Sequence, residues 1–112
     1  RLIMMFQPHG FSPMRMMGRQ IIDEFCAQMS DEDILLMPEI YFAGGTVTRD
    51  ISSRDLISRA VENGKQARYF DNREAAGEFI LANARPGDRI VIMGARDNSL
   101  PGFCQTILER LK

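Results

Sequence analysis

Apolar and polar residues alternate in blocks along the chain, and each block has the length and spacing of one secondary-structure element. Residues 2–6 form a continuous apolar run that ends just before Pro8, which is typical of a strand buried on both faces of a sheet. The next apolar positions recur every three or four residues with polar residues between them, which predicts an amphipathic helix. These positions are Met14, Met17, Ile21, Ile22, Phe25 and Met29.

Three more apolar runs, at residues 33–37, 67–70 and 89–93, predict further strands, and a helical pattern follows each of them. Alternation of continuous apolar strands with helices implies a parallel sheet covered by helices on both faces. The sequence therefore predicts one three-layer, Rossmann-like α/β domain over residues 1–112, with a mainly parallel sheet of about four strands.

Capping residues mark where the predicted helices begin and end. Ser52, with Asp55 three residues later, has the pattern of a capping box, and residues 63–64 are expected to end that helix. Asp71 is expected to cap the following helix, with Glu74 at its third position.

Composition narrows the classes of function. The 112 residues carry 14 basic and 15 acidic side chains, and their interspersed charges leave no basic face for nucleic acid. No apolar run approaches the roughly 20 residues of a membrane span. Cys26 and Cys104 lie in predicted helices without a C-x-x-C pair, which favours buried free thiols in a reduced, cytoplasmic protein and gives no zinc site.

Two further expectations concern the chain's start and its methionines. The chain begins with Arg1 rather than Met, and Leu2 already belongs to an apolar run, so we expect it to be part of a longer polypeptide. The neighbouring Met14, Met16 and Met17 are expected to fill gaps in the core.

Candidate site residues follow the predicted strands, because the carboxyl ends of parallel strands share the edge where open α/β folds bind ligands. Residues 40–51 show no regular period and predict a loop at this edge that is long enough to indicate a functional role. Arginines beside glycines suit a substrate that bears carboxylate or phosphate. In chain order the edge residues are His9, Gly10, Arg15, Glu39, Tyr41, Gly44, Gly45, Arg49, Asp50, Asp71, Gly94, Ala95, Arg96 and Asp97.

Several motifs of self-sufficient enzymes are missing from the sequence. It contains no G-x-x-x-x-G-K-[ST], no G-x-G-x-x-G after a strand and no G-x-S-x-G. We therefore expect neither tight nucleotide binding nor hydrolase activity from this chain alone. From the residues alone, His9 can equally be a packing residue and Arg54 a solvated surface charge. The pattern by itself therefore indicates only an α/β domain with an edge that suits anionic groups.

Three strings, in order along the chain, resemble the C-terminal domain of Mur ligases. They are Phe6-Gln7-Pro8-His9 at a strand end, residues 33–44, and Ser53-Arg54-Asp55-Leu56 at a helix start. The turn at residues 86–88 and the strand that leads to Gly94-Ala95 are similar to the family's last strand and loop. The resemblance covers nearly the whole chain and is strongest to the alanine-adding branch of the family.

The resemblance implies part of an ATP-dependent ligase that forms an amide bond between UDP-N-acetylmuramate and an amino acid (L-alanine) or a peptide, in peptidoglycan synthesis. In such enzymes an N-terminal domain holds the UDP-sugar, and a central domain holds ATP and Mg²⁺. This chain alone would bind neither cofactor and would be inactive. The C-terminal domain closes over the active site and places the incoming amine against an acyl phosphate.

Carried over by position, the resemblance implies a set of site residues. The alanine-adding branch has arginines where this chain has Gly10 and Pro13, so Arg15 is the nearby guanidinium. Arg96-Asp97 replaces a second glycine of the last loop. These departures leave the acceptor open between an amino acid and a peptide. The implied substrate-binding residues are His9, Arg15, Tyr41, Gly44, Ser53 and Arg54, and the implied cofactor-binding residues are Gly94 and Ala95, with none implied as catalytic or metal-binding.

Two other classes of protein remain open from the residues alone. One is a stand-alone flavodoxin-like binding or signalling module, although a receiver of that kind needs an acidic cluster after its first strand and this chain has Gln7-Pro8-His9. The other is a partner-binding domain whose polar edge is merely solvated.

Overall fold

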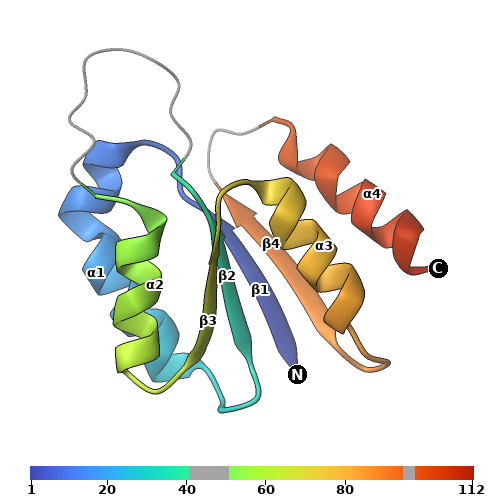
Figure 1. Ribbon diagram of the computed structural model, residues 1–112, viewed down its shortest axis with the longest axis horizontal. Coiled ribbons are helices and arrows are strands. Elements are labelled where there is room, and N and C mark those ends of the chain that lie inside the picture. The colour runs from blue at the N-terminus through green and yellow to red at the C-terminus, as the bar shows by residue number, and fades with distance from the viewer. Residues whose placement is uncertain (41–50, 95–97) are drawn as a thin grey trace.

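A parallel β-sheet lies between two layers of helices in the computed structural model, which describes residues 1–40, 51–94 and 98–112 (Figure 1). Its strands have the order β3-β2-β1-β4, and every neighbouring pair is parallel. The predicted three-layer α/β fold is confirmed. The strands are β1 (Leu2–Gln7), β2 (Ile34–Pro38), β3 (Gln66–Phe70) and β4 (Arg89–Gly94), and the helices are α1 (Phe11–Gln28), α2 (Ser53–Glu62), α3 (Arg73–Asn83) and α4 (Leu100–Leu111).

The sheet has an apolar core on each face, because successive side chains of a strand point to opposite sides. Met4 and Leu35 belong to the core formed with α1 and α2, whereas Met5 and Leu36 belong to the core formed with α3 and α4. Figure 1 shows the same division, with α1 and α2 over one face and α3 and α4 over the other. The central strands β1 and β2 are therefore buried on both faces, as their continuous apolar runs predict.

Helix starts confirm one predicted cap and correct another. Ser52 and Asp55 form the predicted capping box at the start of α2. The cap of α3 is Asn72 rather than Asp71: its side chain accepts a hydrogen bond of 2.8 Å from the backbone N–H of Ala75. Glu74 is consequently the second helical residue, not the third. Asp71 lies one residue too early for this role and contacts a tyrosine hydroxyl instead.

The expected burial is wrong for Met16, Met17 and Cys104, and only partly right for Cys26. Met16 is 78% exposed and Met17 is 48% exposed, while Met14 is buried against the sheet. An α-helix turns about 100° per residue, so Met16 lies about 200° around the helix from Met14, on the solvent side. Cys104 is also exposed and Cys26 only half-buried, and both are free thiols.

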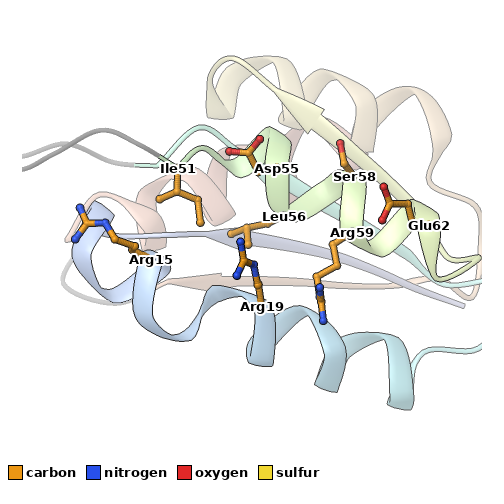
Figure 2. A pocket seen from close by; sticks show the side chains of 8 residues that line it. All are labelled: Arg15, Arg19, Ile51, Asp55, Leu56, Ser58, Arg59 and Glu62. Carbon is orange, nitrogen blue, oxygen red and sulfur yellow. The ribbon is translucent and has the colours of Figure 1, made fainter.

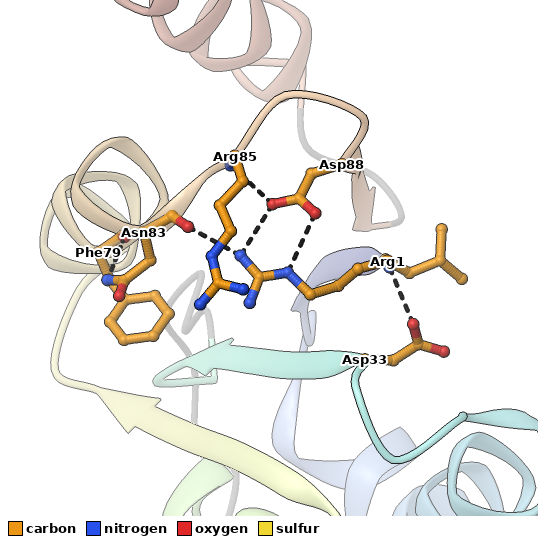
Figure 3. A network of polar contacts seen from close by, with 7 residues as sticks. Arg1, Asp33, Phe79, Asn83, Arg85 and Asp88 are labelled. Atoms are coloured by element: carbon orange, nitrogen blue, oxygen red, sulfur yellow. Dashed lines mark hydrogen bonds and ion pairs between the residues drawn. The ribbon is translucent and has the colours of Figure 1, made fainter.

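At the amino edge of the sheet, polar contacts fix the entry into β1 (Figure 3). The Arg1 guanidinium donates to both carboxylate oxygens of Asp88, at 3.0 and 2.9 Å, and to the carbonyl of Asn83 at 2.8 Å. Hydrogen bonds from Arg1 and from the Arg85 backbone N–H lower the pKa of Asp88 to about 2. Asp33 accepts the Leu2 N–H at 2.9 Å, and this bond lowers the pKa of Asp33 despite partial desolvation. The chain's own side chains therefore hold the start of β1 in place at this edge.

Candidate functional site

The opposite, carboxyl edge holds most of the described candidate residues. His9 follows β1, Glu39 follows β2 and Asp71 follows β3. The helices that follow β1 and β4 cover opposite faces of the sheet (Figure 1). In open α/β folds, a reversal of this kind leaves a crevice outside the strand ends, and ligands bind there. His9, which is half-buried, lies at this position in the fold.

Gly94 ends β4 beside Gln7 of β1, and its lack of a side chain has a packing reason. A Cβ at this position would lie 2.5 Å from Leu100 Cδ1 and 3.1 Å from the Gln7 carbonyl oxygen. The close approach of β4 to β1 and α4 therefore requires glycine here whether or not a ligand binds. Its implied cofactor contact stays a prediction, and Ala95, Tyr41 and Gly44 lie outside the described residues.

Glu39 is the centre of a hydrogen-bond network at this edge. Its Oε1 atom accepts the backbone N–H of Ile40 at 2.8 Å and that of Ser53 at 3.0 Å. Its Oε2 atom accepts the Tyr69 hydroxyl at 3.0 Å. Its backbone carbonyl accepts the side-chain amide of Gln7 at 2.9 Å. One residue therefore connects the ends of β1, β2 and β3 with the start of α2.

Ser53 and Arg54 open α2 beside this network but face different surroundings. The Ser53 side chain is fully buried, and its hydroxyl donates to the Pro38 carbonyl at 2.6 Å. Arg54 is exposed, and its guanidinium carbon lies 4.7 Å from the centre of the Tyr69 ring. Ser53 and Arg54 are both implied as substrate-binding, but of this pair only Arg54 presents its side chain to solvent.

Tyr69 is a site residue that the sequence interpretation missed. Its hydroxyl lies 3.0 Å from Glu39 Oε2 and 3.1 Å from Asp71 Oδ1, so two carboxylates share one proton donor. Burial, followed by the hydrogen bond to Glu39, raises the pKa of Tyr69 to about 12, so the phenol stays a donor at neutral pH. Its signal in the sequence is weak: an aromatic ring with a polar tip near the carboxyl end of a strand.

Arg15 lines a separate groove between α1 and α2, with a volume of about 560 Å³ (Figure 2). Arg19 and Arg59 add positive charge to its lining, and Asp55 and Glu62 add negative charge. Arg59 is held by Asp23 across the two helices at 2.7 and 2.8 Å, which lowers the pKa of that carboxyl. Among the described residues, the lining of this groove includes Arg15 but neither His9 nor Arg54.

Two features of the described part of the chain bear on metal and nucleotide binding. No group of three or more His, Cys, Asp or Glu side chains there could hold a metal ion. The sequence also contains no phosphate-binding glycine loop. In residues 1–40, 51–94 and 98–112, no helix is both long and apolar enough to cross a membrane.

The structure is that of a parallel α/β domain with a polar carboxyl edge, the edge at which open α/β folds bind ligands. Comparison with known proteins gives the family. Residues 1–96 match the model of the family described as "Mur ligase, glutamate ligase domain", and the chain belongs to this family. The resemblance found in the sequence is thereby confirmed.

Relatives among curated proteins carry the name UDP-N-acetylmuramate--L-alanine ligase. The protein from Acetivibrio thermocellus is 36% identical over 97 residues, which cover 87% of this chain and 20% of the relative. The protein from Geotalea uraniireducens is 32% identical over 113 residues, covering 100% and 23% of the two chains. That from Rickettsia felis is 33% identical, covering 99% and 22%. The chain thus spans about a fifth of the length of these relatives.

Proposed function

We propose that residues 1–112 are the C-terminal, amine-substrate-binding domain of an ATP-dependent ligase that joins L-alanine to UDP-N-acetylmuramate. The family match over residues 1–96 supports the domain assignment, and the names of the relatives support the reaction. Both favour this function over a stand-alone flavodoxin-like module. ATP, Mg²⁺ and the UDP-sugar would be held mainly by other domains of the ligase, and the chain by itself would be inactive.

One observation carries the proposal. The strand-end histidine and the Ser-Arg helix start, which are far apart in sequence and which the resemblance assigns to the site, follow strand ends at the same edge of the sheet. His9 follows β1, and Arg54 stands exposed in the first turn of α2, next to the end of β2. A guanidinium at such an edge pairs with a carboxylate in two-point geometry, so Arg54 suits the carboxylate of an incoming amino acid.

The proposed role of this chain in the reaction is to position the amine substrate against the acyl phosphate. In ligases of this type, the amine nitrogen attacks the carbon of an acyl phosphate. The carbon–oxygen bond to phosphate breaks, phosphate leaves, and the amine loses a proton as the amide forms. Holding the two reactants in near-attack geometry and excluding water can contribute several kcal/mol. We assign this orienting role to Arg54 and His9, with Arg15 at the neighbouring groove, and we assign no general base to this chain.

The proposal is tested in the ligase that contains this chain. ADP formation should require both UDP-N-acetylmuramate and L-alanine, and the 112-residue chain alone should form none. Arg54→Ala should raise the KM for L-alanine about tenfold, or about 1.4 kcal/mol, which is near the low end for a hydrogen bond between charged groups. His9→Ala should raise it as well.

A matched control is Arg89→Ala, which removes an exposed arginine at the opposite edge of the sheet and should leave the KM unchanged. ADP formation without an amine substrate would contradict the proposed reaction. A lower KM for a peptide than for L-alanine would contradict the proposal that L-alanine is the amine substrate. Equal kinetics for all three variants would mean that the edge is only solvated.

A further inference from the structure

Arg54 is held at the carboxyl edge by an aromatic ring. Its guanidinium carbon lies 4.7 Å from the centre of the Tyr69 ring, within the roughly 6 Å range of cation–π attraction. In the part of the chain that the structure describes, no ion pair joins Arg54 to a carboxylate. The guanidinium therefore lies over the Tyr69 ring, whose hydroxyl contacts the carboxylates of Glu39 and Asp71.

The ring is itself fixed by the carboxylate that fixes the backbone beside Arg54. Glu39 accepts the Tyr69 hydroxyl at 3.0 Å and the Ser53 N–H at 3.0 Å. The Arg54 N–H donates to the Ser52 hydroxyl at 2.9 Å, which completes the start of α2. Glu39 thus fixes both the backbone beside Arg54, through Ser53, and the ring that contacts the Arg54 side chain, through the Tyr69 hydroxyl.

We propose that Tyr69 is a positioning residue that holds the Arg54 guanidinium at the carboxyl edge, ready to receive the carboxylate of the incoming amino acid. The identity of that carboxylate rests on the proposed function. A guanidinium that is already placed loses less side-chain entropy when it binds, so the contact with Tyr69 should appear as affinity for the amine substrate.

The first test is kinetic, in the ligase that contains this chain. Tyr69→Leu should raise the KM for L-alanine about 2- to 5-fold, the range for a cation–π contact at an exposed site, and leave kcat unchanged. The effect should vanish when Arg54 is already alanine, because Tyr69 acts through Arg54. An equal effect of Tyr69→Leu with and without Arg54, or no effect in the wild-type background, would overturn the proposal.

Two more variants keep the test independent of folding defects. Arg54→Lys retains the charge at an exposed position but removes the planar group that stacks on the ring, and it should raise the KM. A wild-type KM for this variant would overturn the proposal. Phe79→Leu is the matched control: it removes the ring that Arg68 covers at 5.0 Å, away from the carboxyl edge, and should not change the KM.

The second test uses NMR on the 112-residue chain and separates this inference from the proposed function. The side-chain Nε–H proton of Arg54 should be shifted upfield by the Tyr69 ring. The shift should be lost in Tyr69→Leu and kept in Phe79→Leu. An Arg54 signal at the position of a free arginine would overturn the inference even for an active ligase. Conversely, a ligase that ignores L-alanine would refute the proposed function, while the NMR shift would still show that Tyr69 holds Arg54.

Discussion

Replacing Glu39 by alanine should destabilise the fold more than any other exchange of a single carboxylate at the carboxyl edge. The variant removes the acceptor of three hydrogen bonds, from Ile40 N, Ser53 N and the Tyr69 hydroxyl, at 2.8 to 3.0 Å. A buried hydrogen bond to a charged group is worth about 1.5–3 kcal/mol, and a donor left without a partner costs about 1–3 kcal/mol. The site is only partly buried, so water can replace some of these contacts. We expect a loss of about 2–4 kcal/mol in the free energy of unfolding.

Glu39→Gln separates the hydrogen bonds from the charge. Its amide oxygen can still accept the two backbone N–H groups, and the Tyr69 hydroxyl can turn to accept from the amide nitrogen. The expected loss is about 1 kcal/mol, because the neutral acceptor makes weaker bonds than the carboxylate.

Urea unfolding of the 112-residue chain, followed by far-ultraviolet circular dichroism, measures both losses. With a slope of about 2 kcal/mol per molar urea, typical of a domain of this size, Glu39→Ala should lower the midpoint by roughly 1–2 M. Glu24→Ala, which removes an exposed carboxylate from α1, is the control and should stay within about 0.5 kcal/mol of wild type. A Glu39→Ala variant as stable as this control would refute the central role of Glu39.

Three further predictions use the same unfolding measurement. Gly18→Ala should cost about 1–3 kcal/mol, because the new Cβ would lie 2.9 Å from Leu56 Cδ2 where α1 packs on α2. Gly102→Ala meets nothing within 4 Å in α4 and should instead stabilise by about 0.5–1 kcal/mol; a stabilising Gly18→Ala would contradict the packing argument. Because Arg1 holds the pKa of Asp88 at about 2, below its ordinary 3.8, the unfolded chain binds more protons between these values. The stability that Asp88 provides is complete above about pH 4 and is lost as pH falls towards 2, so Asp88→Asn should flatten this acid limb, and an unchanged pH profile would speak against the Arg1 contact.

Local patterns in the sequence determine the elements of this protein. The continuous apolar runs of β1 and β2 predict their burial on both faces, and Ser52 with Asp55 marks the start of α2 to the residue. Sequence also indicates the carboxyl edge as the place for the site, since the strands of an alternating α/β chain run parallel. These features depend on residues only a few positions apart, so the linear sequence contains the information that determines them.

Contacts between distant segments were decided only by the tertiary structure. The pairing of β1 with β4 joins Leu2 to Arg89, and it sets the strand order that leaves His9 where the helices diverge. The ring of Tyr69 meets Arg54 only because β3 lies beside β2 and α2 packs over both. Hydrophobic periodicity reports which face of an element is buried, but it carries no information about which polar side chains of other elements will meet there. For that physical reason the sequence predicts the edge, whereas the Glu39–Tyr69–Arg54 arrangement on it becomes visible only after folding.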